Sequence, residues 1–205
     1  MTQPAIEHVV FDVGRVLLHW DPELAFLEII PDETERRWFF ENVCTPAWNL
    51  EQDRGRSWED AEAEAIARHP GHEDSIRAFR SNWHAMVPYA LDESVEILRA
   101  LLRDGHDVTL LTNFAADTFQ EAQDRFAFLN EARGVTVSGE VGLIKPEADI
   151  YHRHVEQFSL QPSATLFIDD SPANVDGARE AGWNAVLFTD VDRLKQDLQK
   201  HCVVV

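Results

Sequence analysis

Four short apolar runs, rich in β-branched residues, stand out from a polar chain. They cover residues 8–13, 107–113, 164–170 and 184–189, and a weaker run covers residues 134–139. Continuous apolar strands are typical of a sheet that is covered on both faces, and such sheets are usually parallel. The pattern therefore predicts a buried parallel sheet.

Helical periodicity fills the intervals between the runs from residue 91 onward. Segments 91–106, 147–160 and 171–184 carry apolar residues at helical spacing, and Gly105 ends the first of them as a C-terminal cap. Strands that alternate with helices form right-handed βαβ units. We expect an α/β fold with a doubly wound, Rossmann-like parallel sheet.

The chain between the first two strands breaks this alternation. Segments 21–30, 32–43, 57–69 and 73–86 are helical in period and composition, with no convincing strand among them. We expect a helical cap domain of residues 21–87, inserted into an α/β core domain of residues 1–20 and 88–205. Ligands bind at the carboxyl edge of open α/β sheets, and such a cap would overhang that edge. The alternative is that these helices only extend the core.

Charge limits the partners. The 205 residues include 18 Lys and Arg against 37 Asp and Glu, a formal net charge of −19, which repels nucleic acid and anionic membranes. A small anionic substrate would need positive charge inside its site. Two cysteines, no leader pattern and no run of about 20 apolar residues predict a soluble, cytoplasmic protein. We expect a monomer or a homodimer.

Polar residues follow three of the apolar runs. Asp12 follows the first, Thr112 and Asn113 close the second, and Asp169 and Asp170 close the third. Because the carboxyl ends of parallel strands meet at one edge of the sheet, these side chains should converge. Each alone has an ordinary explanation as a turn or capping residue. Their combination predicts a site.

Three carboxylates in an apolar setting repel one another unless they are protonated or bound to a cation. Carboxylate oxygens suit a hard dication, above all Mg²⁺. Lys145, in a loop before a predicted helix, adds a second positive charge, although alone it would be a solvated lysine. With both cations, the site could hold a phosphoryl group while Asp12 attacks phosphorus.

The order of Asp12, "LLTN", "KPEADIY" and "FIDDSPANVDGAREAGW" resembles the haloacid dehalogenase superfamily, in particular its small-molecule phosphatases with a helical cap after the first motif. The resemblance implies a Mg²⁺-dependent hydrolase of small phosphorylated metabolites. Asp12 would become phosphorylated, and Thr112 and Lys145 would steady the transferring group. The implied metal ligands are Asp12, Asp169, Asp170 and the backbone carbonyl of Gly14.

Gly14 departs from that pattern. Most phosphatases of the superfamily carry a second Asp there, as general acid and base, and Arg15 replaces the glycine that usually follows. The "FD.G.V" start is similar to that of sugar-1-phosphate phosphatases. Because losing a positioned acid costs roughly 10²- to 10⁴-fold, sugar-1-phosphates, acyl phosphates and aryl phosphates should be favoured over alkyl esters. His19 or Asp21 could supply the proton, although a histidine at this place more often packs.

Three residues are candidates for substrate binding. Asn113 closes a strand at the site, and Arg15 could bind a substrate anion or pair with cap carboxylates. Trp48 lies in a predicted loop of the cap, where it could stack on a sugar. For Trp48, packing between cap helices is the favoured alternative.

Two other functions compete. In a 2-haloacid dehalogenase, Asp12 would attack carbon without a metal, but Asp169 and Asp170 would repel the substrate carboxylate, and dehalogenases of this fold lack that acidic pair. A phosphoacceptor receiver domain has a different order of motifs. A catalytically weak or silent binding protein of the same fold stays open because of Gly14.

Overall fold

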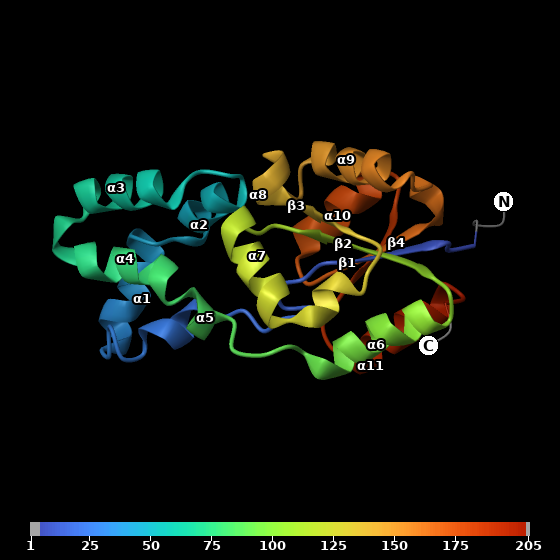
Figure 1. The fold of residues 1–205 in the computed structure, drawn as a ribbon, viewed down its shortest axis with the longest axis horizontal. Coiled ribbons are helices and arrows are strands. Elements are labelled where there is room, and N and C mark those ends of the chain that lie inside the picture. The colour runs from blue at the N-terminus through green and yellow to red at the C-terminus, as the bar shows by residue number, and fades with distance from the viewer. Residues whose placement is uncertain (1–4, 204–205) are drawn as a thin grey trace.

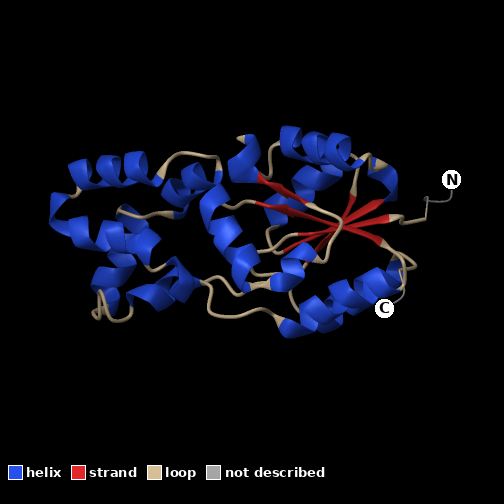
Figure 2. Ribbon diagram, in the orientation of Figure 1, coloured by secondary structure: helices blue, strands red, loops and turns tan. Residues whose placement is uncertain are grey.

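The computed structural model describes residues 5–203 and contains the expected parallel sheet (Figures 1 and 2). Its strands, in the order β3-β2-β1-β4-β5, are β1 (His8–Phe11), β2 (Asp107–Thr112), β3 (Val135–Val137), β4 (Thr165–Asp169) and β5 (Asn184–Leu187). All neighbouring strands pair in parallel. The predicted fold class and all five strand segments are confirmed.

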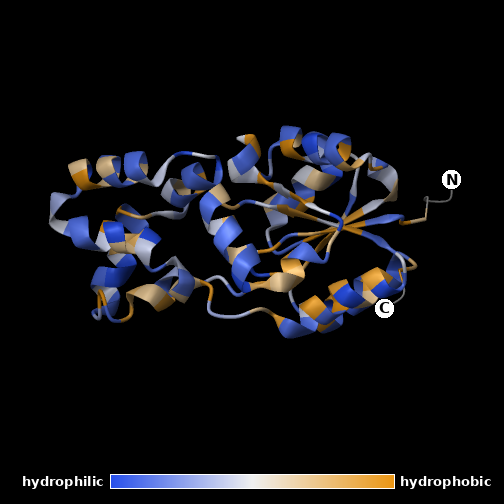
Figure 3. Ribbon diagram, viewed as in Figure 1, coloured by the Kyte–Doolittle hydropathy of each residue, from blue (hydrophilic) through white to orange (hydrophobic). Residues whose placement is uncertain are grey.

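Helices cover both faces of this sheet. They are α6 (Asp92–Arg103), α7 (Ala116–Arg125), α8 (Ser138–Val141), α9 (Ala148–Phe158), α10 (Pro172–Glu180) and α11 (Val191–Lys200). Strand residues alternate between the faces: Val10 and Phe167 pack with α9 and α10, and Val9 and Ile168 face the core that includes α6 and α11. The hydropathy colouring shows the apolar strands at the centre (Figure 3). Short 3-10 helices cover Ala127–Asn130 and Pro162–Ala164.

The segment between β1 and α6 forms a separate group of helices, here called the inserted helices. They are η1 (Pro22–Phe26), α1 (Glu33–Asn42), α2 (Pro46–Asp53), α3 (Trp58–Arg68), η2 (Pro70–His72), α4 (Glu73–Ser81) and α5 (Trp83–Met86). They lie beyond the carboxyl ends of the strands (Figure 1). This arrangement supports a cap at residues 21–87, and the domain division itself stays a prediction.

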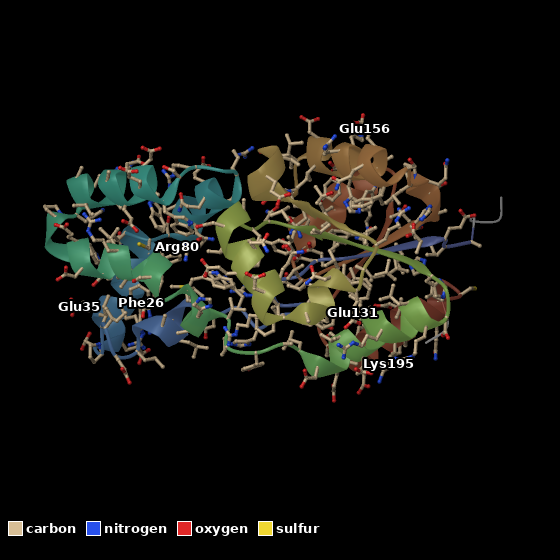
Figure 4. All side chains as sticks on the ribbon, in the orientation of Figure 1. Phe26, Glu35, Arg80, Glu131, Glu156 and Lys195 are labelled. Atoms are coloured by element: carbon tan, nitrogen blue, oxygen red, sulfur yellow. The ribbon has the colours of Figure 1, made fainter. Side chains whose placement is uncertain are left out.

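The inserted helices contact the α/β core through polar bridges. Arg80, labelled in Figure 4, pairs with Asp117 at 2.9 Å and with Glu121, both on α7. The Trp58 indole donates to Asp117 at 3.1 Å. Arg54, just after α2, forms a two-bond ion pair with Glu147. No helix within residues 5–203 has the length and apolar character to cross a bilayer.

Three inserted segments differ from the sequence predictions. Segment 73–86, predicted as one helix, is divided at Asn82 into α4 and α5. Segment 21–30 forms only a short 3-10 helix. Pro31 disfavours helical backbone at Ile30. The Ile30 carbonyl accepts instead from Arg36 Nη1 at 2.9 Å. Residues 46–53, expected to be a loop, form α2, because the Thr45 hydroxyl caps it by accepting from Trp48 N at 3.0 Å.

Candidate active site

Lys145 joins the ends of two strands. Its Nζ lies 2.8 Å from Asp12 Oδ1 and 2.7 Å from Asp169 Oδ2, and donates to the Leu111 carbonyl at 3.2 Å. Lys145 is only 2% exposed, and Asp169 is fully buried. A desolvated ammonium with three acceptors is a fixed positive charge at the sheet edge.

The acids outnumber this cation. The carboxylates of Asp12, Asp169 and Asp170 place oxygens within 4.8 Å of one another. Burial raises the pKa of Asp12 to about 8; Lys145 opposes the shift, and Asp169 adds to it. Burial and the Asp169 charge also raise the pKa of Asp170. Three acids facing one ammonium leave an excess of negative charge, which a divalent cation would balance. This set of oxygen donors fits Mg²⁺.

Local contacts orient the acids. Asp169 Oδ1 accepts from Ser171 N at 2.8 Å and from Asn174 Nδ2 at 3.0 Å, both at the start of α10. Asp12 Oδ1 accepts from Val13 N at 2.7 Å. Asp12 and Asp169 are therefore held by backbone and side-chain donors as well as by Lys145.

The chain after β2 contributes Thr112 and Asn113. The Thr112 hydroxyl is buried and has no hydrogen-bond partner within residues 5–203, so it is free to donate to a bound group. Asn113 clamps Lys145: its Oδ1 accepts from Lys145 N at 2.8 Å, and its Nδ2 donates to the Lys145 carbonyl at 3.0 Å. Asn113 also lines a cavity that Gly14 borders, so its predicted role in substrate binding stays open.

This cavity, of about 90 Å³, lies between the sheet edge and the inserted helices. Its walls include Gly14, Trp20, Asn49, Asp53, Trp58 and Trp83. A Cβ added to Gly14 would meet no described atom within 4 Å, so the space in front of Gly14 is open. Aromatic walls with a few polar groups are typical of small-molecule sites.

Asp53, the last residue of α2, is the acid that sequence reasoning missed. Burial raises its pKa to about 7, and a hydrogen bond from the Ala115 backbone N–H and the charge of Lys145 act in the opposite direction. Its backbone carbonyl accepts from Ser138 Oγ at 2.6 Å. The sequence signal that could have identified Asp53 is its place two residues before Gly55, a glycine that marks the end of the helix.

A larger cavity of about 630 Å³ shares Gly14 with the small one and reaches Asp170. Arg15, Asp170 and Ser171 line it. Arg15 has a φ of 58°, and its Nε donates weakly to the Trp20 carbonyl at 3.4 Å. The expected contact of Arg15 with a substrate anion stays a prediction that this position supports.

The sequence of residues 6–182 matches the haloacid dehalogenase-like hydrolase family. The chain belongs to this family. Among curated relatives, a sesquiterpene phosphatase of Aspergillus oryzae, astK, is 24% identical over 88% of this chain and 89% of its own. A flavin mononucleotide hydrolase of Arabidopsis thaliana is 29% identical over 53% of this chain and 44% of its own.

Solved structures of other haloacid dehalogenase-like hydrolases share the fold. A predicted family hydrolase of Porphyromonas gingivalis has a TM-score of 0.76 and 24% identity, with 96% of this chain and 98% of that one covered. A Bacteroides thetaiotaomicron enzyme, solved with magnesium and inorganic phosphate, has a TM-score of 0.71 and 22% identity over 93% and 99% of the two chains. At this identity the likeness shows the fold.

Other predicted residues of this hydrolase have structural roles. Trp48 fits the favoured alternative of packing: it is 8% exposed and packs inside the inserted helices against Phe79, with its indole N–H donating to the Ala61 carbonyl at 3.3 Å. The small cavity is lined instead by Trp20, Trp58 and Trp83.

The two residues considered as proton donors are also engaged. His19 stacks on Tyr89 with ring centroids 4.8 Å apart, although it also lines the small cavity. Asp21 caps η1 by accepting from Glu23 N at 3.0 Å. Asp21 is therefore committed to local structure.

Proposed function

We propose that this hydrolase is a Mg²⁺-dependent phosphatase of small phosphorylated metabolites that acts through an aspartyl-phosphate on Asp12. The observation that carries the proposal is the convergence of three carboxylates with a buried ammonium. Asp12, Asp169 and Asp170 would hold the metal with the Gly14 carbonyl, and Lys145 lies between Asp12 and Asp169. A dehydrated anion such as phosphate needs that positive charge in a chain of net charge −19.

Each residue of the site has its own role in the proposed reaction. An oxygen of Asp12 attacks phosphorus, the bond from phosphorus to the ester oxygen breaks, and the ester oxygen leaves with the bonding electron pair and takes a proton from an acid or from solvent. Water then attacks the same phosphorus, releases inorganic phosphate and restores the Asp12 carboxylate. Lys145 and the unpartnered Thr112 hydroxyl bind the phosphoryl oxygens throughout. Bound Mg²⁺ supplies Lewis-acid stabilisation of the charge on those oxygens.

The relatives and the cavity support the proposed substrate class. Two curated relatives are named for the hydrolysis of phosphorylated compounds. Trp20, Trp58 and Trp83 provide flat apolar walls in the cavity that Gly14 borders, and Asn49 adds a polar group. Such a wall suits a small organic group, and sugar-1-phosphates are the first candidates.

A 2-haloacid dehalogenase is the second candidate, because a dehalogenase of Xanthobacter autotrophicus shares the fold with a TM-score of 0.67. Its reaction needs a site that accepts a carboxylate. Here Asp169 and Asp170 stand beside Asp12 and would repel one. The repulsion of a carboxylate substrate by these two acids favours the phosphatase over the dehalogenase.

A substrate panel tests the proposal. Release of phosphate from sugar, aryl and acyl phosphates, and of halide from 2-haloacids, is measured with Mg²⁺ or with EDTA. We expect phosphate release that EDTA and Asp12→Asn both abolish. Halide release that persists in EDTA, without phosphatase activity, would contradict the proposal and favour the dehalogenase.

A further inference from the structure

The position that usually carries the acid is open here. Gly14 is not among the glycines with positive φ, and a Cβ built on it would meet no described atom within 4 Å. An L-amino acid would therefore fit at residue 14. Residue 14 has no side chain, so the small cavity is bordered by Gly14 on the core side and by Asp53 on the side of the inserted helices.

Asp53 is fixed against the core. The Ala115 N–H donates to its carboxyl, and Asn49 Nδ2 donates to Oδ2 at 3.3 Å. The Ser138 hydroxyl holds its backbone carbonyl at 2.6 Å. The next residue, Arg54, is tied to Glu147 at 2.6 and 2.9 Å. These contacts hold the Asp53 carboxyl beside the loop that follows β2.

Few other groups could exchange a proton in this cavity. Among the described residues that line it, Asp53 and His19 are the titratable ones. The His19 ring is stacked on Tyr89. Lys145 acts on Asp53 through its charge, and the pKa of Asp53, raised by burial to about 7, lies where a group serves as both acid and base.

We propose that Asp53 is the general acid and base of this hydrolase, acting from the inserted helices in place of the carboxyl that residue 14 lacks. The inference rests on the proposed phosphatase function. Protonated Asp53 gives its proton to the ester oxygen as the bond to phosphorus breaks, so a neutral alcohol leaves. Asp53 then takes a proton from the water that attacks the aspartyl-phosphate, and the Asp12 carboxylate leaves phosphorus.

This assignment widens the substrate class. Without an acid at Gly14, only esters with good leaving groups would react well. With Asp53 as the donor, alkyl phosphates, including primary sugar phosphates, become substrates. Alkyl and aryl phosphates therefore distinguish the two accounts.

The experiment measures kcat/KM for an alkyl phosphate and for p-nitrophenyl phosphate in the wild type and in Asp53→Asn. We expect a loss of about 10²- to 10⁴-fold for the alkyl ester and of less than about tenfold for p-nitrophenyl phosphate, whose leaving group needs no proton. The variant should also accumulate the aspartyl-phosphate with p-nitrophenyl phosphate, because the base for the second step is missing.

Three further variants sharpen the test. Glu51→Gln, an exposed acid on the same helix, should leave both values unchanged. Ser138→Ala weakens the docking of Asp53, so any loss should be larger for the alkyl ester than for p-nitrophenyl phosphate. Gly14→Asp in the Asp53→Asn background should restore alkyl ester hydrolysis, because the space in front of Gly14 is open.

The outcomes separate the two proposals. If the wild type hydrolyses no phosphate, or Asp12→Asn has no effect, the proposed function fails and this assignment fails with it. If an Asp12-dependent phosphatase shows equal losses for both esters in Asp53→Asn, or no loss, only the role of Asp53 is overturned. A dependence on the leaving group that appears in His19→Asn and not in Asp53→Asn would also overturn it.

Discussion

Lys145 connects the electrostatics of the site to the stability of the fold. It is the cation that the structure places between Asp12 and Asp169, at 2.8 and 2.7 Å. Taking charges out of water is costly, and removal of one partner leaves the others buried without compensation. The same ammonium that would bind phosphate therefore also makes two buried acids tolerable.

Replacing Lys145 by Met should lower the free energy of unfolding by about 3 to 5 kcal/mol at pH 7, the usual cost of breaking a buried pair. Urea denaturation measures this change. Lys195→Met on the exposed side of α11 (Figure 4) is the matched control and should change stability little. A loss for Lys145→Met no larger than for the control would show that the ion pairs are not needed for folding.

The raised pKa of Asp53 predicts a pH dependence of stability. Between its ordinary value of 3.8 and about 7, the folded state holds a proton that the unfolded state has lost. Stability therefore falls as pH rises through this window. Asparagine does not titrate, so Asp53→Asn should gain stability relative to the wild type between pH 4 and pH 8, on the order of 4 kcal/mol.

Denaturation of both proteins at several pH values measures this difference, with Glu51→Gln as the control for loss of one acidic side chain. A stability difference between Asp53→Asn and the wild type that stays constant from pH 4 to pH 8 would mean that the pKa of Asp53 is not raised. In that case the carboxyl could not be poised to exchange protons near neutral pH.

At the level of elements, α10 holds the Lys145 loop in place. A Cβ on Gly177, inside α10, would lie 2.5 Å from the Pro146 carbonyl oxygen and 3.0 Å from the Pro146 Cβ. Only glycine allows this approach of helix and loop. The loop that follows Lys145 is therefore positioned by close packing against α10.

Gly177→Ala should push this loop away, lowering the free energy of unfolding by about 1 to 3 kcal/mol despite the better helix propensity of alanine. Phosphatase activity should fall with it, because Lys145 moves. Thermal melting and kcat measure the two effects. Gly71→Ala, where a Cβ meets nothing within 4 Å, is the control. Equal behaviour of the two variants would contradict the packing argument.

The elements also show what the sequence could predict. The strands are continuous apolar runs, a local pattern, and their ends bring Asp12, Thr112 and Asp169 to one edge as expected. The start of α2 was missed although Thr45 and Pro46 are a common helix start. For Trp48 the sequence left stacking on a substrate and packing between helices both open, because its exposure depends on which face of α2 packs inward.

Asp53 could not be assigned from the sequence. Its environment depends on Ala115 and Lys145, which are remote in sequence and reach it only when the inserted helices dock on the core. Contacts of this kind leave no local pattern. The acid at a helix end was visible, but its burial was not.

At the scale of the molecule, the fold brings positive charge to the places where the two parts meet. Arg54 pairs with Glu147, and Arg80 pairs with Asp117, so these bridges join the inserted helices to the core in a chain of net charge −19. Exposed pairs contribute little stability and are weakened by salt. The site itself contains the buried Lys145, and under the proposed function it would also hold a divalent cation.

Phosphorylation of Asp12 tests the central claim most directly. The wild type is mixed with Mg²⁺ and p-nitrophenyl phosphate, quenched in acid within the first turnover, digested and examined by mass spectrometry, with Asp12→Asn as the control. We predict one added phosphoryl group on the peptide that contains Asp12, absent from the variant and from samples with EDTA. Turnover of the substrate without phosphate on Asp12, or with phosphate on another residue, would contradict the account.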